Sequence, residues 1–173
     1  MKQETKTPIT AKGVFIEVTY FLLIVLLSVA GGSKLIDHQK FVGEMLNQAF
    51  PHWFSWVLIY TLPYYELAIV TAILVGRKYN FKKLRLKINL ERLRKWALLN
   101  SCVLMSFFLL YSILALSKVF GRVPCSCGGI IERLHWPQHV VLNAFYVLIT
   151  IVSLRLTRQE RPAVQISPPI IAA

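Results

Sequence analysis

The chain has 173 residues, of which 55% are hydrophobic and 16% are charged, and its mean hydropathy is +0.54. A soluble domain carries about 25% charged residues, so this composition excludes a soluble globular fold. The formal net charge of +12 does not indicate nucleic-acid binding, because the basic residues gather in a few segments that flank apolar runs.

Four apolar runs are long enough to cross a bilayer as helices, and they occupy residues 14–32, 54–75, 96–120 and 137–156. About 20 helical residues cross the hydrocarbon core. A backbone inside lipid must satisfy its polar groups within its own segment, so the sequence predicts an all-α membrane protein, a bundle of four transmembrane helices. The first run is long for the apolar region of a signal peptide, so we expect a retained helix.

The first loop, residues 33–52, carries a helical pattern of its own. Phe41, Met45 and Ala49 recur four residues apart, and Pro51 ends the pattern. This spacing predicts a short amphipathic helix that lies on the membrane surface in the first outer loop.

The segment at residues 77–95, between the second and third runs, holds nine of the 20 Lys and Arg residues. Part of it alternates polar and apolar residues like a strand, whereas Leu86, Leu90 and Leu93 fit a helix leading into the third run. Both interpretations stay open from the sequence. We expect this segment to contact anionic lipid headgroups.

The distribution of basic residues predicts the orientation in the membrane. Fifteen fall in this segment, the N-terminal tail and the C-terminal stretch from Arg155 onward. Five fall on the other side, namely Lys34, Lys40, Lys118, Arg122 and Arg133. The positive-inside rule then gives a cytoplasmic N-terminal tail at 1–12, a membrane domain at 13–156 and a disordered cytoplasmic tail at 157–173. The segment between the last two runs is expected outside.

That outer segment holds Cys125 and Cys127 within the sequence PCSCGG. A disulfide between residues i and i+2 requires a turn, which the glycines allow, and such a strained bond is easily reduced. A redox-active pair is the favoured interpretation, because a staple that closes so short a loop removes little unfolded-state entropy. Metal binding and a structural staple stay open. Cys102 lies inside the third run, too far away to join the pair, and is expected to be a buried, inert core residue.

Three polar residues recur at helical spacing where the last run begins. His135, His139 and Asn143 lie four residues apart, and they share one face if the helix starts early enough. They are candidates to orient a quinone carbonyl, to shuttle a proton or to help bind a metal. The alternative is that they are satisfied at headgroup level and in a helix interface.

Glu66 stands in the middle of the second run, in the sequence LPYYE. Because a charged carboxylate near the middle of the bilayer costs about 2.5–3.5 kcal/mol, we expect it to be protonated, paired or hydrated. A buried helix contact and a role in proton or polar chemistry are both open.

Three motifs together give a family resemblance. GGSKLID at residues 31–37 followed by Phe41, then LPYYE at 62–66, then CSCGG at 125–129 resembles the MauE branch of the DoxX-like membrane proteins, over roughly residues 13–156. The resemblance implies a bacterial four-helix inner-membrane protein that helps mature the disulfide-rich subunit of methylamine dehydrogenase beside a thioredoxin-like partner. It also implies that Cys125 and Cys127 are the redox pair, although Gly128 stands where the family motif has an aromatic residue.

The sequence and the resemblance together predict thiol–disulfide exchange. The expected partner is a thioredoxin-like periplasmic protein or a disulfide-rich exported substrate, and quinone is a candidate electron acceptor by analogy with other four-helix thiol oxidases. One rival hypothesis is a copper-handling protein with Cys125, Cys127 and His139 as ligands. The other is a non-catalytic membrane scaffold of an oxidase or transport complex.

Overall fold

The computed structural model describes residues 10–49, 51–78, 90–117, 119 and 136–159. These residues form helices and no strands, and the helices in chain order are α1 (Ala11–Ile36), α2 (His38–Leu46), α3 (His52–Lys78), α4 (Leu90–Leu116) and α5 (Trp136–Gln159). Four of them, α1, α3, α4 and α5, are long and apolar enough to cross a membrane. The predicted all-α fold with four spanning helices is therefore confirmed.

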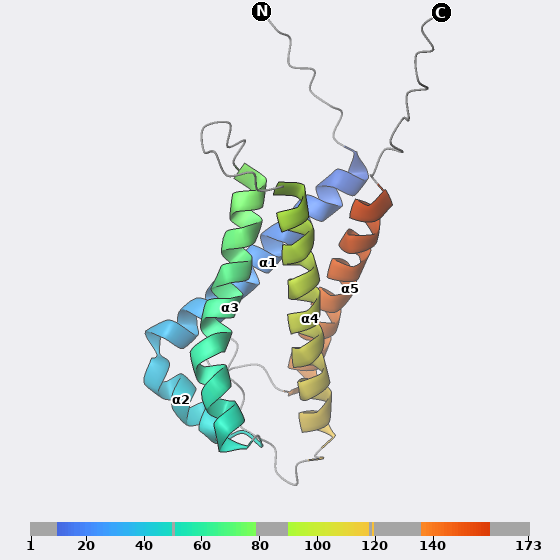
Figure 1. Ribbon diagram of the computed structural model, residues 1–173. Helices are drawn as coiled ribbons and strands as arrows, with labels where there is room; N and C mark the ends of the chain where they lie inside the picture. The colour runs from blue at the N-terminus through green and yellow to red at the C-terminus, as the bar shows by residue number, and fades with distance from the viewer. Residues whose placement is uncertain (1–9, 50, 79–89, 118, 120–135, 160–173) are drawn as a thin grey trace, which may run out of the picture.

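The long helices form one bundle in which α1 runs diagonally (Figure 1). The start of α1, the end of α3, the start of α4 and the end of α5 lie at one end of the bundle, and α2 lies toward the other end beside α3. Because α1 is inclined, its last turn reaches the middle of α3 and not the level where α3 begins. This inclination decides which polar residues meet inside the bundle.

The short helix predicted for the first outer loop is present as α2, with Phe41 and Met45 buried against the bundle at 2% and 3% exposure. It ends at Leu46, so Ala49 lies beyond it. Gln48, two residues after the helix, is buried and pairs with Tyr111 of α4. The spacing therefore predicted the helix correctly but not its end at Leu46. The Gln48–Tyr111 contact follows directly after that end.

The ends of two long helices also differ from the apolar runs. α1 continues to Ile36, beyond the predicted end at Gly32, and so includes Lys34. α4 begins at Leu90, which supports the helical interpretation for that part of the basic segment, and ends at Leu116, before the predicted end at Phe120. Residues 79–89 lie outside the described residues.

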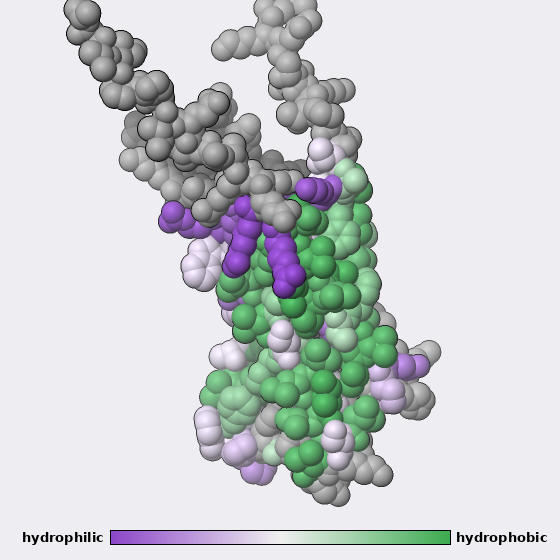
Figure 2. Space-filling model, turned by 90° about the vertical axis from the view of Figure 1, so that its right-hand side faces the viewer, coloured by the Kyte–Doolittle hydropathy of each residue, from purple (hydrophilic) through white to green (hydrophobic). Residues whose placement is uncertain are grey.

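The face of the bundle shown in Figure 2 is apolar over most of the described residues. Phe21, Leu110 and Val141 are 57%, 57% and 69% exposed, whereas Leu23, Leu27 and Leu98 are fully buried. Large apolar side chains on the outside are typical of a helix bundle whose solvent is lipid, where burial of apolar area gives little net attraction between helices.

Polar contacts link the helices where that attraction is weak. Ser153 of α5 donates to Thr19 of α1 at 2.8 Å, and Tyr65 of α3 donates to Asn100 of α4 at 2.7 Å. Such bonds between membrane helices contribute about 0.6 kcal/mol each on average. These two bonds help to fix how α5 is oriented against α1 and how α3 is oriented against α4.

Candidate functional site

The site begins with a close crossing of α1 and α3. A Cβ atom on Gly31 would lie 3.2 Å from the backbone oxygen of Pro63 and 3.3 Å from the Cβ atom of Glu66. A side chain here would require the neighbouring atoms to shift by a few tenths of an ångström, so glycine favours the close approach of the two backbones. The crossing therefore explains why a glycine of α1 lies opposite the LPYYE sequence of α3.

One helical turn beyond this crossing, Lys34 meets Glu66. The Nζ atom of Lys34 donates to both carboxylate oxygens of Glu66, at 2.8 and 2.9 Å, and to the backbone oxygen of Ala30 at 3.1 Å. The exposed fractions of the two side chains are 7% and 0%. Of the three states expected for Glu66, the structure shows the paired one, with the partner supplied by the C-terminal turn of α1.

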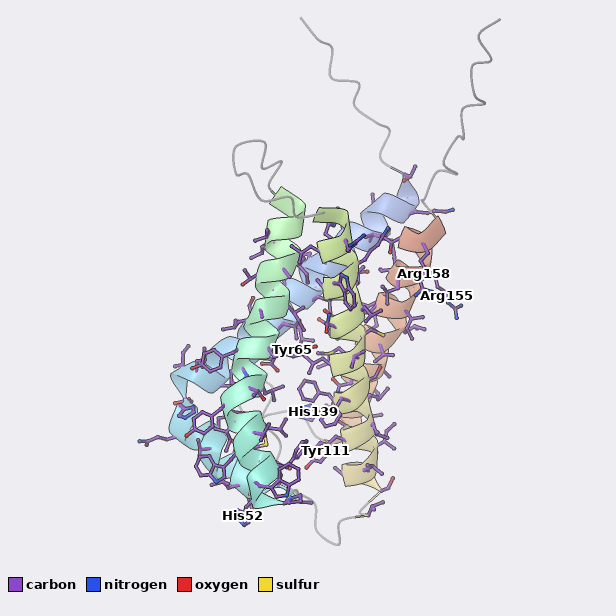
Figure 3. The ribbon with its side chains drawn as sticks, in the orientation of Figure 1. His52, Tyr65, Tyr111, His139, Arg155 and Arg158 are labelled. Atoms are coloured by element: carbon purple, nitrogen blue, oxygen red, sulfur yellow. The ribbon has the colours of Figure 1, made fainter. Side chains whose placement is uncertain are left out.

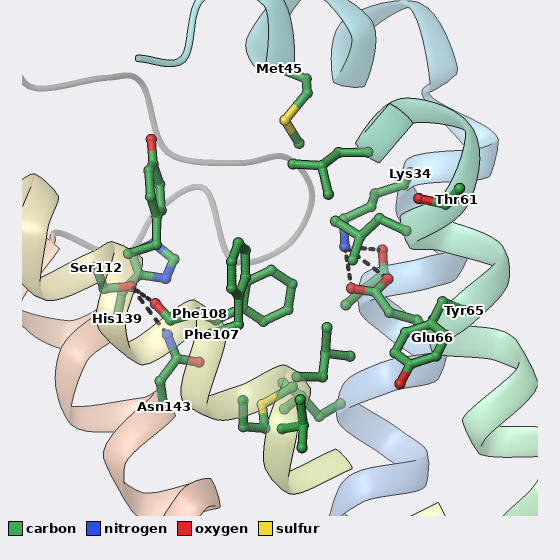
Figure 4. Close-up of a pocket in the computed structure, with 18 of the residues that line it drawn as sticks. Lys34, Met45, Thr61, Tyr65, Glu66, Phe107, Phe108, Ser112, His139 and Asn143 are labelled. Carbon is green, nitrogen blue, oxygen red and sulfur yellow. Dashed lines mark hydrogen bonds and ion pairs between the residues drawn. The ribbon is translucent and has the colours of Figure 1, made fainter. Parts of the chain in front are cut away.

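A cavity of about 460 Å³ lies against this ion pair, between α1, α3, α4 and α5 (Figure 4). Its lining is mostly apolar, and the Lys34–Glu66 pair forms a polar patch on one side. Its volume lies within the range of small-molecule sites, about 300–1,000 Å³.

The opposite wall of the cavity comes from α4 and α5. His139 and Asn143 lie one turn apart near the start of α5, and both line the cavity. Asn143 donates to the hydroxyl of Ser112 at 3.3 Å, and Ser112 donates to the backbone oxygen of Phe108 at 2.7 Å. The predicted shared face of His139 and Asn143 is thus present, and it is turned into the bundle.

Aromatic side chains lie between the two polar walls. Figure 4 shows Phe107 and Phe108 between the Lys34–Glu66 pair and the side chains of His139 and Asn143. Tyr65 and Tyr111 also line the cavity, and Figure 3 places His139 and Tyr111 in the half of the bundle that lies away from Arg155 and Arg158. The cavity therefore offers flat apolar surfaces flanked by hydrogen-bonding groups.

The cysteine pair and His135 lie outside the described residues, so their predicted roles stay predictions. Cys102 lies in α4 and is a free thiol. It is partly buried, whereas a buried core residue was expected. Within the described ranges, no group of three His, Cys, Asp or Glu residues could hold a metal ion.

The sequence reasoning missed the pairing partner of Glu66. Lys34 was counted with the outer loop because the apolar run ends at Gly32, and hydropathy does not reveal a contact between residues 32 positions apart. In the structure, Glu66 lies at the crossing with Gly31, and Lys34 lies one turn further along α1.

Glu17 of α1 is also paired, at the end of the bundle where α4 begins. The guanidinium of Arg94 donates to Glu17 at 2.8 Å, and the same guanidinium lies 4.7 Å from the ring centre of Tyr20. Both charged side chains are about one third exposed, so this pair is a modest link between α1 and α4.

Comparison with known proteins gives one match. The family model described as methylamine utilisation protein MauE matches residues 12–156. The matched range includes Lys34, Glu66, His139 and Asn143, together with the segment that holds Cys125 and Cys127. None of the curated proteins and none of the solved structures matches the chain.

Proposed function

Because the chain belongs to the MauE family of methylamine utilisation proteins, we propose that it is a bacterial inner-membrane protein that exchanges disulfides with an exported partner through Cys125 and Cys127. The partner is a thioredoxin-like periplasmic protein or a disulfide-rich substrate, such as one matured for methylamine utilisation. The chain then acts as a thiol–disulfide oxidoreductase or as an accessory factor to one.

The observation that carries this proposal is the position of the helix ends on either side of the pair. Cys125 follows the last residue of α4, Leu116, by nine positions, and Cys127 precedes the first residue of α5, Trp136, by nine positions. Nine residues span at most about 30 Å. The segment that holds the pair joins these two helix ends, which lie at the end of the bundle nearer to His139, and this connection supports the proposal.

The charges at the other end support an outside location for the pair. Lys12, Arg92, Arg155 and Arg158 are exposed near the ends of α1, α4 and α5 that lie together. Under the positive-inside rule this end faces the cytoplasm, and the cysteine segment then faces the periplasm, where disulfides persist.

The exchange reaction follows from ordinary thiol chemistry. A thiolate of the partner attacks one sulfur of the Cys125–Cys127 disulfide, the bond between the two cysteines breaks, and a mixed disulfide forms. A second thiolate of the partner then attacks the mixed disulfide. The partner leaves with a new disulfide, and the pair of the chain is left as a dithiol that holds two electrons and two protons.

Single cysteine variants test this reaction. In Cys125→Ser or Cys127→Ser, the remaining thiolate can attack the disulfide of the oxidised partner, and the chain has no second thiol of the pair to resolve the product. We therefore expect a mixed disulfide with the partner on a non-reducing gel. The adduct should disappear on reduction and in the Cys125→Ser/Cys127→Ser double variant. If neither single variant traps a partner and the wild type instead binds Cu(I) with a stoichiometry that falls on His139→Ala, the copper-handling function replaces this proposal.

A further inference from the structure

The cavity between the Lys34–Glu66 pair and Asn143 has the form of a ligand site. Its polar groups are few and lie on opposite sides of an apolar interior of about 460 Å³. We propose that this cavity binds the ring of a lipophilic quinone taken from the bilayer. The proposal rests on the proposed function for its redox step, but it rests on the cavity alone for binding.

Some side chains that line the cavity from α3 and α4 are also exposed on the bundle surface. Tyr65 of α3 and Val103 and Phe107 of α4 line it, and they are 40%, 59% and 43% exposed on the outer surface of the bundle. A ligand that reaches the cavity past these apolar side chains comes from the hydrocarbon phase. This favours a membrane-soluble molecule with a long tail over a water-soluble substrate.

The interior suits a flat ring. Phe107 and Phe108 lie between the two polar walls, and Leu58, Leu104 and Leu142 form apolar surface around them. Aromatic side chains stack against another ring in offset or edge-to-face arrangements. A plain acyl chain fills apolar space equally well, so the polar walls decide the class of ligand.

One polar wall presents acceptors, and the other presents both donors and acceptors. On one side the three N–H groups of Lys34 are used by Ala30 and Glu66, whereas the carboxylate of Glu66, which accepts from Lys34 alone within the described part of the chain, has lone pairs left. On the other side the amide of Asn143 has a second N–H and an oxygen, because its one bond among the described residues is the bond donated to Ser112. An acyl chain uses none of these groups.

A quinone uses both kinds of group, because its oxygens change character with its redox state. The carbonyl oxygens of the oxidised ring accept hydrogen bonds, and the hydroxyl groups of the quinol donate them. Glu66 can accept from a quinol hydroxyl, and the amide of Asn143 can donate to a carbonyl or accept from a hydroxyl, so the cavity can hold both forms. The redox step balances without a further reactant: the dithiol of the chain loses two electrons and two protons, and the quinone takes up both to become a quinol.

Photolabelling with an azidoquinone tests this assignment. The protein is the Cys125→Ser/Cys127→Ser double variant in vesicles of phosphatidylethanolamine and phosphatidylglycerol, so the result does not depend on the thiols. We expect saturable labelling of peptides from α3, α4 and α5 that line the cavity. Asn143→Leu in this background should weaken binding by roughly fivefold to tenfold, since it removes one hydrogen-bonding group.

Thr71→Val is the control, because the exposed hydroxyl of Thr71 bonds to the backbone of Leu67 within α3 and does not line the cavity. It should leave the affinity unchanged. Three results would overturn the proposal. They are labelling that spreads over the whole lipid-facing surface, labelling that Asn143→Leu does not affect, and labelling that an alkane of equal tail length suppresses as well as an unlabelled quinone does. Such a result leaves partner trapping untouched, whereas quinone binding without a trapped partner rejects the proposed function alone.

Discussion

At the scale of single residues, Lys34 and Glu66 form a buried pair inside the bundle. Glu66 is fully buried, and Lys34 is bonded to both of its carboxylate oxygens and to a backbone oxygen of α1. Removing either charge leaves the other without its partner in a medium of low dielectric constant. Loss of one member of a buried pair costs about 3–5 kcal/mol, whereas replacing both members is often nearly neutral.

A double-mutant cycle measures this coupling. Glu66→Gln and Lys34→Met should each lower the midpoint of thermal unfolding in detergent, by an amount equivalent to about 3 kcal/mol or more. The double variant Lys34→Met/Glu66→Gln should recover most of the loss. Additive losses in the double variant would show that the two side chains contribute independently and that the pair is not the source of stability.

At this scale the sequence predicted the burial of Glu66 and the shared face of His139 and Asn143, because both follow from position along one helix. It did not predict that Lys34 pairs with Glu66 or that Asn143 contacts Ser112, since these contacts depend on how separate helices are inclined. Spacing within one helix is visible in a single sequence. Contacts between helices are not.

At the scale of elements, the crossing of α1 and α3 at Gly31 positions one wall of the cavity. The missing side chain brings α1 to within van der Waals contact of the turn of α3 that contains Pro63. Lys34, one turn later on α1, thereby reaches Glu66. The GGSKLID sequence of α1 and the LPYYE sequence of α3 therefore meet in one contact between the two helices.

Two adjacent glycines allow a matched test of this crossing. Gly31→Ala places a methyl group 3.2 Å from the Pro63 oxygen, and overpacking of this kind costs about 1–3 kcal/mol. Gly32→Ala meets nothing within 4 Å and should be neutral or slightly stabilising. Equal thermal midpoints for the two variants in detergent would show that the helices do not cross closely at Gly31.

The elements were largely predictable because long apolar runs define membrane helices by length and composition. Their ends were less predictable. α1 continues through Lys34 to Ile36 because the charge finds a partner inside the bundle, and the hydropathy of the run alone places the end at Gly32. α2 was predicted from the spacing of Phe41 and Met45, and both side chains are buried as that spacing requires.

At the scale of the whole molecule, the arrangement of helix ends separates two chemically different ends. The end where α3 finishes and α4 begins carries exposed basic side chains, including Arg92, and the termini of the described chain lie there (Figure 1). At the other end, α4 finishes before the segment with the cysteine pair and α5 begins after it. The match over residues 12–156 confirms the MauE part of the family resemblance, and the matched range includes both ends of the bundle.

Thiol labelling on intact spheroplasts tests the proposed orientation. After mild reduction, a membrane-impermeant maleimide should label Cys125 or Cys127 and should spare Cys102, which lies within α4. Cys125→Ser/Cys127→Ser provides the control and should show no labelling. Labelling of the pair that requires rupture of the inner membrane would place the cysteine segment in the cytoplasm instead.

The central claim is that Cys125 and Cys127 form a reversible disulfide, and their redox state in living cells tests it most directly. The chain has three cysteines, so a mass-shifting maleimide added after acid quenching and denaturation reports the state as a count of labels. We predict one label, on Cys102, in growing cells, three labels directly after a pulse of dithiothreitol, and a return to one label when the reductant is washed away. Three labels under all of these conditions would contradict the account.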